Sequence, residues 1–396
     1  MLDSIALALL PAGLHDLLPP DAEREASLVE RAMGVFRGHG YERVKPPLVE
    51  FEDSLLSGVG RAWSLQTFRL LDPESQRMMA VRADMTLQVA RLAASRLLQA
   101  PRPLRLCYSG EVLRVGGAQL SPERQFRQIG CELIGSLEAA ADAEIILIAH
   151  SALSRIGVRG LSIDLNLPTT VPTLFAAYGV AGSEERRLAA ALAHRDVAVA
   201  GAAPGIGPLL VALLDVAGPA DTAIEKLARI ELPAAAEASR ARLVETIRLI
   251  RLANPSLTLT VDPLERQGFE YQTGLSFTIF ARGSRRELGR GGRYRIGGEP
   301  NDLPQPSGAG PKGEPAVGFS LFSDAILNAT PASERPRRVY LPLGTPHDVA
   351  ERLRGEGWIT VSALTAAADS VAEAQRLGCS YSVVADSVEP APVDPS

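Results

Sequence analysis

Apolar positions concentrate in two strand-like stretches near the middle of the chain, separated by a polar segment. Residues 104–114 are apolar at most positions and end on Arg114, a pattern typical of a buried strand that delivers one cation to a cleft. Residues 115–124 contain two adjacent glycines, a Ser-Pro pair and few apolar side chains, which predicts an exposed loop. In the stretch that follows, a period of two places Gln128 and Glu132 on the same face. We therefore expect a hairpin that contributes polar groups to a pocket.

A carboxylate and an amide buried on one strand face need partners, because removing an unpaired charge from water is costly. A cationic ligand would satisfy Glu132, but so would an arginine of the same chain, and Gln128 could bond to backbone; these two residues alone favour the second interpretation. Asp84 and Thr86 lie at a predicted strand-to-helix turn. As helix caps they would contribute about 1 kcal/mol, although such a turn also suits a ligand's ammonium or hydroxyl group.

The remaining pattern divides the chain into segments of different character. Residues 169–255 are rich in Ala, Leu, Arg and Glu at helical spacing, which predicts a helical insertion between two parts of one core. The stretch Arg290 to Tyr294 predicts a glycine turn, which is more often structural than phosphate-binding. The predicted divisions are a first core part at 1–168, the insertion at 169–255, a second core part at 256–328, a small α/β unit at 337–386 and a disordered tail at 387–396.

Composition and charge narrow the class of protein. The chain has 396 residues, of which 46% are hydrophobic and 22% charged, which is typical of a soluble globular protein with two or three domains. A net charge of −5 predicts no general basic surface for nucleic acid. The three cysteines lack metal-ligand spacing, so we expect reduced thiols, no metal and no cofactor. No apolar stretch is long enough to cross a bilayer, so we expect a cytoplasmic location.

Several segments, in a shared order, resemble the catalytic core of histidyl-tRNA synthetases over roughly residues 11–328. Residues 40–47 resemble class II motif 1, the hairpin that carries Arg114 resembles motif 2, and residues 316–325 occupy the place of motif 3. The resemblance implies an α+β fold with an antiparallel sheet flanked by helices. Two further segments are similar to the family's histidine-pocket strand and histidine-specific signature: residues 124–135 and 268–274.

Three positions depart from the pattern of an active synthetase. Gln267 stands where the family has an arginine that stabilises the reacting carboxylate and phosphate, and Gln272 replaces a tyrosine. Ala325 stands where motif 3 supplies an ATP-binding arginine. Loss of one charge stabiliser of a transition state typically costs on the order of 10²–10³ in rate, so we expect negligible adenylation.

The residues that resemble amino-acid contacts are better retained, with Asp84 in the place of the family's glutamate. Amino-acid recognition is therefore expected to survive without chemistry. Arg114 would neutralise a carboxylate or an anionic ligand, or remain as a structural ion pair. The resemblance thus implies a histidine-binding pocket formed by Asp84, Thr86, Arg114, Gln128, Glu132 and Tyr271.

The last predicted unit resembles a shortened anticodon-binding domain, so we expect no selection of tRNA. Together with the segment 84–91, these losses make the chain similar to the regulatory subunits of ATP phosphoribosyltransferase. That resemblance implies a non-catalytic homodimer core that joins a short-form catalytic subunit in a hetero-oligomer. It also implies a requirement in the first step of histidine biosynthesis and feedback by histidine as effector. An active histidyl-tRNA synthetase and a free-standing histidine or tRNA sensor are the alternatives.

Overall fold

The chain folds into two units, Met1–Pro331 and Ala332–Ser396, which are described separately. The computed structural model describes residues 9–56, 63–117, 122–265, 272–297, 313–331, 337–383 and 390–393. None of the helices within these ranges is long and apolar enough to span a membrane.

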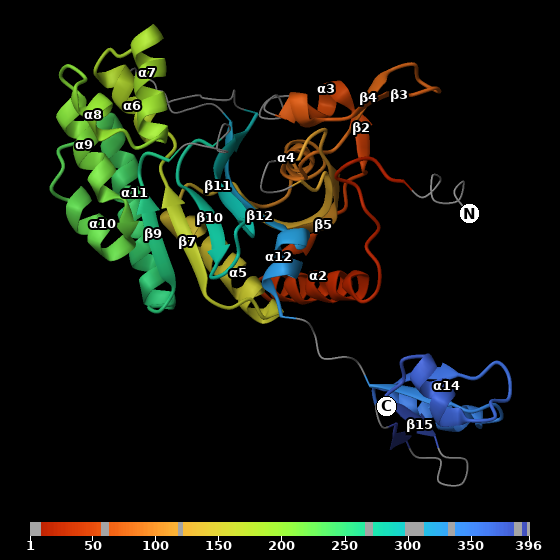
Figure 1. Cartoon of the computed structure of the whole chain (residues 1–396). Helices are drawn as coiled ribbons and strands as arrows, with labels where there is room; N and C mark the ends of the chain where they lie inside the picture. Colours follow the sequence, from red (N-terminus) through yellow and green to blue (C-terminus); the bar gives the residue numbers. More distant parts are fainter. Residues whose placement is uncertain are drawn as a thin grey trace. The chain divides into compact units, whose positions relative to one another are not determined.

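A nine-stranded sheet forms the centre of the first unit (Figure 1). All neighbouring strands are antiparallel except two parallel pairs, at one edge and near the other. This arrangement confirms the predicted α+β fold with a mainly antiparallel sheet. In spatial order the strands are β1 (Glu42–Arg43), β5 (Leu104–Leu113), β6 (Gln125–Ile134), β12 (Glu314–Phe322), β11 (Gly289–Ile296), β10 (Ser276–Ala281), β7 (Leu161–Asn166), β9 (Thr258–Asp262) and β8 (Gly218–Pro219).

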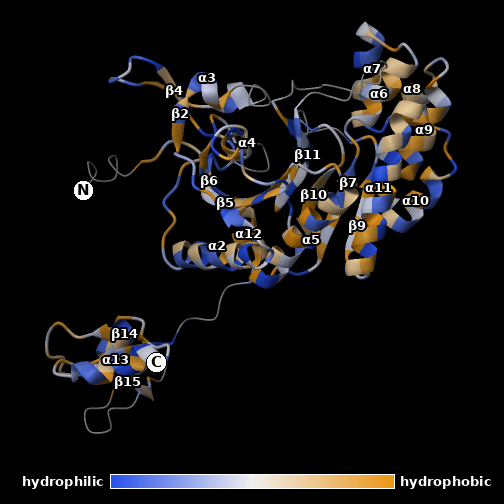
Figure 2. Cartoon of the chain, turned by 180° about the vertical axis from the view of Figure 1, so that it is seen from behind, coloured by the Kyte–Doolittle hydropathy of each residue, from blue (hydrophilic) through white to orange (hydrophobic). Residues whose placement is uncertain are grey.

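Helices α2 (Asp21–Gly38) and α5 (Ala139–Ile156) pack beside each other on one side of the sheet (Figure 1). Helix α2 begins after Pro20 with acidic residues in its first turn, which favour a helix N-terminus. Its apolar residues recur at helical spacing and are buried, whereas its other face is hydrophilic, as Figure 2 shows. Burial of this stripe and of the apolar side of α5 covers the sheet and holds β5 and β6 in place.

The predicted hairpin is present as β5 and β6, with Gly110 opposite Gln128 and Tyr108 opposite Gly130. Gly130 has no room for a larger side chain, because a Cβ atom there would lie 2.6 Å from the Tyr108 ring. Strand β12 pairs with the other side of β6. Strand β6 therefore lies between β5 and β12, and both of its faces are largely buried.

Six helices gather at the far end of the sheet, in the region that the helical spacing predicts (Figure 1). These helices are joined directly to the sheet, because β8 lies between two of them in the sequence and pairs with β9. These helices are α6 (Thr170–Ala177), α7 (Gly182–Ala193), α8 (Val197–Gly201), α9 (Gly207–Val216), α10 (Ala220–Leu227) and α11 (Ala234–Ala253).

A small three-stranded sheet and a short helix lie at the opposite end. Helix α4 (Thr86–Ala94) follows this sheet directly and begins at the predicted strand-to-helix turn. Helix α12 (Ser323–Ala329) continues directly from β12. The small sheet contains β2 (Val49–Phe51), β4 (Met78–Val81) and β3 (Arg69–Leu71), with α3 (Glu52–Leu55) beside it.

The second unit is a four-stranded sheet with two helices, close to the predicted α/β pattern. The expected disorder of residues 387–396 is wrong for Pro390–Pro392, which form an antiparallel edge strand against β15. Prolines are tolerated on an edge strand, and the buried side chain of Val393 anchors this one. The elements are β14 (Ile359–Ser362), β13 (Arg338–Leu341), β15 (Tyr381–Val383), β16 (Pro390–Pro392), α13 (His347–Gly355) and α14 (Ser370–Arg376).

Candidate functional site

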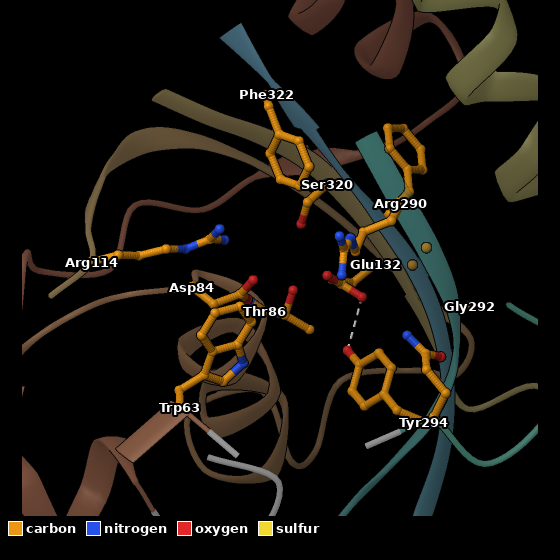
Figure 3. Close-up of a pocket in the computed structure, with 14 residues that line it drawn as sticks. Trp63, Asp84, Thr86, Arg114, Glu132, Arg290, Gly292, Tyr294, Ser320 and Phe322 are labelled. Carbon is orange, nitrogen blue, oxygen red and sulfur yellow. Dashed lines mark hydrogen bonds between the residues drawn. The ribbon is translucent and has the colours of Figure 1, made fainter. Parts of the chain in front are cut away.

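A pocket opens above the centre of the large sheet, between α4 and strands β6, β12 and β11 (Figure 3). It contains about 480 Å³ not filled by protein atoms, including its open mouth. Four of the predicted site residues line it, namely Asp84, Thr86, Arg114 and Glu132. The other lining residues are Trp63, Gln272, Arg290, Gly291, Gly292, Tyr294, Gly318, Phe319, Ser320 and Phe322.

Strand register explains where the pocket has its floor. Glu132 on β6 lies opposite Gly318 on β12, which lies opposite Gly292 on β11. The two glycines leave the space that side chains would fill, because a Cβ atom on Gly318 would lie 1.8 Å from Glu132 Oε2. A Cβ atom on Gly292 would likewise lie 2.4 Å from Gln272 Oε1. The hollow therefore depends on two glycines placed in line with one carboxylate.

Glu132 is 1% exposed and is held by two tyrosines. Tyr108 Oη donates to Oε1 at 3.1 Å, and Tyr294 Oη donates to Oε2 at 2.9 Å. Among the described residues, no arginine, lysine or histidine forms an ion pair with this carboxylate. Burial raises the pKa of Glu132 to about 8, with a further contribution from the negative charge of Asp84. The structure thus gives Glu132 hydrogen-bond donors but no counter-charge of its own.

Asp84, Thr86 and Gln128 form a connected network below Glu132. Asp84 Oδ1 accepts from the backbone N–H of Thr86 at 2.8 Å, and Oδ2 accepts from Gln128 Nε2 at 3.0 Å. Gln128 Oε1 accepts from the backbone N–H of Met85 at 2.8 Å, while Nε2 also donates to Ser320 Oγ at 2.5 Å. Gln128 is fully buried and orients the Asp84 carboxylate from behind, whereas Asp84 and Thr86 reach the pocket.

Arg114 enters the pocket from the end of β5 within an aromatic enclosure. Its guanidinium carbon lies 4.8 Å from the ring centroids of both Trp63 and Phe126, and 5.9 Å from that of Phe322. Its Nε donates to the backbone oxygen of Ala83 at 3.3 Å. Desolvation lowers the pKa of Arg114 while nearby Asp84 opposes that shift, and the group remains a cation. Within the described part of the chain it forms no ion pair, so its charge is balanced only weakly.

Several lining residues were missed by the sequence prediction. The stretch Arg290 to Tyr294 is not a glycine turn but the middle of strand β11, so Arg290, Gly292 and Tyr294 all face or border the pocket (Figure 3). Gly-Gly inside a strand signals close approach of another group, and this signal was available in the sequence. Trp63 and Ser320 carried no comparable signal, because their roles depend on contacts between distant segments.

The remaining predicted positions are of two kinds. Tyr271 and Gln267 lie outside the described residues. Gln272 is 8% exposed and lines the pocket, and Ala325 is buried in α12.

Around the pocket, carboxylates from Asp84 and Glu132 face the same space as the guanidinium groups of Arg114 and Arg290 (Figure 3). This arrangement suits a small ligand that carries both a cationic and an anionic group.

The raised pKa of Glu132 gives a prediction about stability. The carboxyl group of Glu132 loses its proton near the ordinary pKa of 4.5 in the unfolded chain and only near pH 8 in the folded chain. Its contribution to the free energy of unfolding is therefore fully present below pH 4.5 and is lost as the pH rises to 8. The free energy of unfolding should therefore fall by up to about 1.4 kcal/mol per pH unit within this window. Urea denaturation across the window measures it, and Glu132→Gln should remove this part of the slope. An unchanged slope in the variant would contradict the assigned pKa.

Comparison with known proteins places the chain in a family. The histidyl-tRNA synthetase family model matches residues 13–326. The ATP phosphoribosyltransferase regulatory subunit of Rhodospirillum centenum is 55% identical over 379 residues, covering 96% of this chain and 95% of the relative. The chain belongs to the family of ATP phosphoribosyltransferase regulatory subunits. Its relatives bear the name of a regulatory subunit, in agreement with the predicted loss of synthetase chemistry.

Solved structures of this family and of related synthetases share the fold. An ATP phosphoribosyltransferase regulatory subunit/histidyl-tRNA synthetase from Bacillus halodurans superimposes with a TM-score of 0.75 at 22% identity, covering 93% of this chain and 96% of the other. A chain of the ATP phosphoribosyl transferase (HisG:HisZ) complex from Thermotoga maritima gives a TM-score of 0.58 at 16% identity, covering 76% and 97%. At these identities the likeness establishes the fold alone.

Proposed function

We propose that this chain is the non-catalytic regulatory subunit of an ATP phosphoribosyltransferase and that its pocket binds histidine as effector. The observation that carries the proposal is the buried carboxylate of Glu132, which has no cationic partner among the described residues, in a chain that matches the histidyl-tRNA synthetase family model. A ligand ammonium or imidazolium group would supply the missing counter-charge. The protein would thereby act in the first step of histidine biosynthesis and in its feedback control.

The pocket groups support an amino-acid ligand in a definite orientation. Glu132 and Asp84 would meet the cationic groups of histidine, with Thr86 adding a hydrogen bond. Arg114, held in its aromatic enclosure, would neutralise the ligand carboxylate. Tyr271 is proposed as a further contact. For feedback, histidine must bind the active and inhibited assemblies with different affinity.

The proposed assembly is a homodimer core joined to a short-form catalytic subunit. The sequence has Gln267 and Ala325 where an active synthetase has arginines, so the chain would contribute regulation and not transfer chemistry. We further propose that the small second unit is a shortened relative of an anticodon-binding domain, without selection of tRNA.

The test is the rate of phosphoribosyl-ATP formation by a short-form catalytic subunit of the same organism, with and without this protein, across a histidine titration. We expect the rate to rise on addition of the protein and the histidine sensitivity to change. An unchanged rate, given a catalytic subunit shown to be folded, would refute the regulatory function. Histidine-dependent exchange of pyrophosphate into ATP would instead establish an active synthetase. Histidine binding without any effect on the phosphoribosyltransferase would indicate a free-standing sensor.

Trp63 provides a direct reporter of ligand binding. The chain has two tryptophans, and the second, Trp358, belongs to the other unit. In the variant Trp358→Phe, the emission of Trp63 should change saturably with histidine, because its ring contacts Arg114 at the pocket. Fluorescence titration measures the effect. Saturable binding by calorimetry without any change in this emission would place the ligand elsewhere.

A further inference from the structure

A second cleft lies behind β11, between this strand and helix α11. It contains about 640 Å³ not filled by protein atoms, including its open side. It is separate from the first pocket, and of the first pocket's lining residues it shares only Tyr294. The lining residues are Leu137, Ala238, Ser239, Arg242, Thr273, Gly274, Leu275, Arg293, Tyr294, Arg295 and Pro315.

Three arginines line this cleft against a single buried carboxylate. Asp142 is 1% exposed; its Oδ1 pairs with Arg293 Nε at 2.7 Å and its Oδ2 with Arg242 Nη1 at 3.1 Å. Arg295 adds a third guanidinium and donates to the backbone oxygen of Gly313 at 2.8 Å. Among the described residues, the lining of the cleft thus brings together three guanidinium groups, two of which share the one carboxylate of Asp142.

The two inner arginines have different roles. Arg293 uses all three nitrogens within the protein, since Nη1 and Nη2 donate to the backbone oxygens of Ser136 at 2.8 Å and Glu138 at 2.6 Å. Arg242 uses only Nη1, and among the described residues its Nε and Nη2 have no hydrogen-bond partner. Asp142 thus fixes Arg242 on the wall of the cleft while leaving two of its nitrogens available to a ligand.

We propose that this cleft binds a small phosphate-bearing anion. Arg242 would donate Nε–H and Nη2–H to two phosphate oxygens, the paired geometry in which a guanidinium recognises phosphate. Ser239, on the preceding turn of α11, and Thr273 line the same cleft, and their hydroxyl groups would supply further donors. Tyr294 lines both pockets, and its hydroxyl group donates to Glu132 in the first one.

The experiment titrates the full chain with inorganic pyrophosphate by calorimetry. Ala238 is exposed on α11, and Ala238→Glu places a carboxylate four residues before Arg242, where it would pair with that guanidinium. We expect this variant to weaken pyrophosphate binding by about tenfold or more. The matched control is Ala235→Glu, at an exposed position of the same helix that does not line the cleft.

A second pair of variants removes the cation itself. Arg242→Gln should weaken pyrophosphate binding by about tenfold or more, whereas Arg248→Gln, which removes an exposed arginine paired with Glu245 on the same helix, should not. Arg114→Gln tests the other pocket. Binding that is lost in Arg114→Gln and unchanged in the cleft variants would overturn the proposal, as would the absence of saturable binding to the unmodified chain.

The source of the phosphate is tested by competition with a single-stranded oligoribonucleotide. Displacement of pyrophosphate by low concentrations of the oligonucleotide, with a steep salt dependence, would assign the cleft to nucleic acid and refute the small-molecule ligand. This proposal does not depend on histidine binding, because Ala238→Glu should leave the Trp63 response to histidine unchanged. A result that refutes anion binding in the cleft can therefore be told apart from one that refutes histidine binding in the first pocket.

Discussion

Replacement of Glu132 by glutamine should weaken histidine binding by on the order of 100-fold, which corresponds to about 3 kcal/mol. The glutamine has nearly the same shape and can still accept from Tyr108 or Tyr294, so the folded structure is retained. It lacks the negative charge that would face the ligand cation in a site where water is excluded. Calorimetric titration of the full chain with histidine measures the loss.

The pH dependence separates a charge effect from a loss of packing. Because the pKa of Glu132 lies near 8 in the free protein, the carboxyl is mostly protonated at pH 7 and must release its proton when a cation binds. The affinity of the unmodified protein should therefore rise by about fivefold between pH 7 and pH 8 relative to that of Glu132→Gln. Comparison with the variant cancels the titration of the ligand itself.

Glu185→Gln is the matched control, because Glu185 is exposed on α7 and does not line the pocket. It should bind histidine as the unmodified protein does. Equal histidine affinities of Glu132→Gln and Glu185→Gln would exclude Glu132 from the histidine site. They would also contradict the proposed orientation of the ligand.

The part of this site that lies on one element was predictable from the sequence. Alternation along residues 125–134 placed Gln128 and Glu132 on one face, and strand β6 confirms that geometry. The same pattern did not predict that Gln128 would be enclosed behind Asp84. Local periodicity states which way a side chain points, whereas its burial depth depends on the strands that pair on either side.

The groups that complete the pocket come from segments distant in sequence. Tyr294 reaches Glu132 across β12, and Trp63 reaches Arg114 from the segment between β2 and β3. Nothing within a single segment encodes these pairings, because they follow from strand order and register. Arg114 illustrates the consequence: the sequence suggested a ligand contact or an ion pair, and the structure surrounds it with aromatic rings.

Replacement of Gly318 by alanine should lower the free energy of unfolding by about 3 kcal/mol or more, because the new methyl group has no space. Its Cβ atom would lie 1.8 Å from Glu132 Oε2 and 2.6 Å from the backbone oxygen of Cys131. Glu132 can move only by leaving its tyrosine partners, and the backbone of β6 can move only by disturbing the centre of the sheet. Urea denaturation measures the change.

Gly34→Ala is the matched control for this substitution. Gly34 lies inside α2, and no atom of a neighbouring segment lies within 4 Å of the position that a Cβ atom would take there. Alanine should therefore be neutral or stabilise the protein by up to about 1 kcal/mol through helix propensity. In Gly318→Ala the displaced Glu132 should also lose histidine binding, even where the variant is folded. A folded Gly318→Ala protein with unchanged stability and unchanged histidine affinity would show that Gly318 does not form the floor of a ligand pocket.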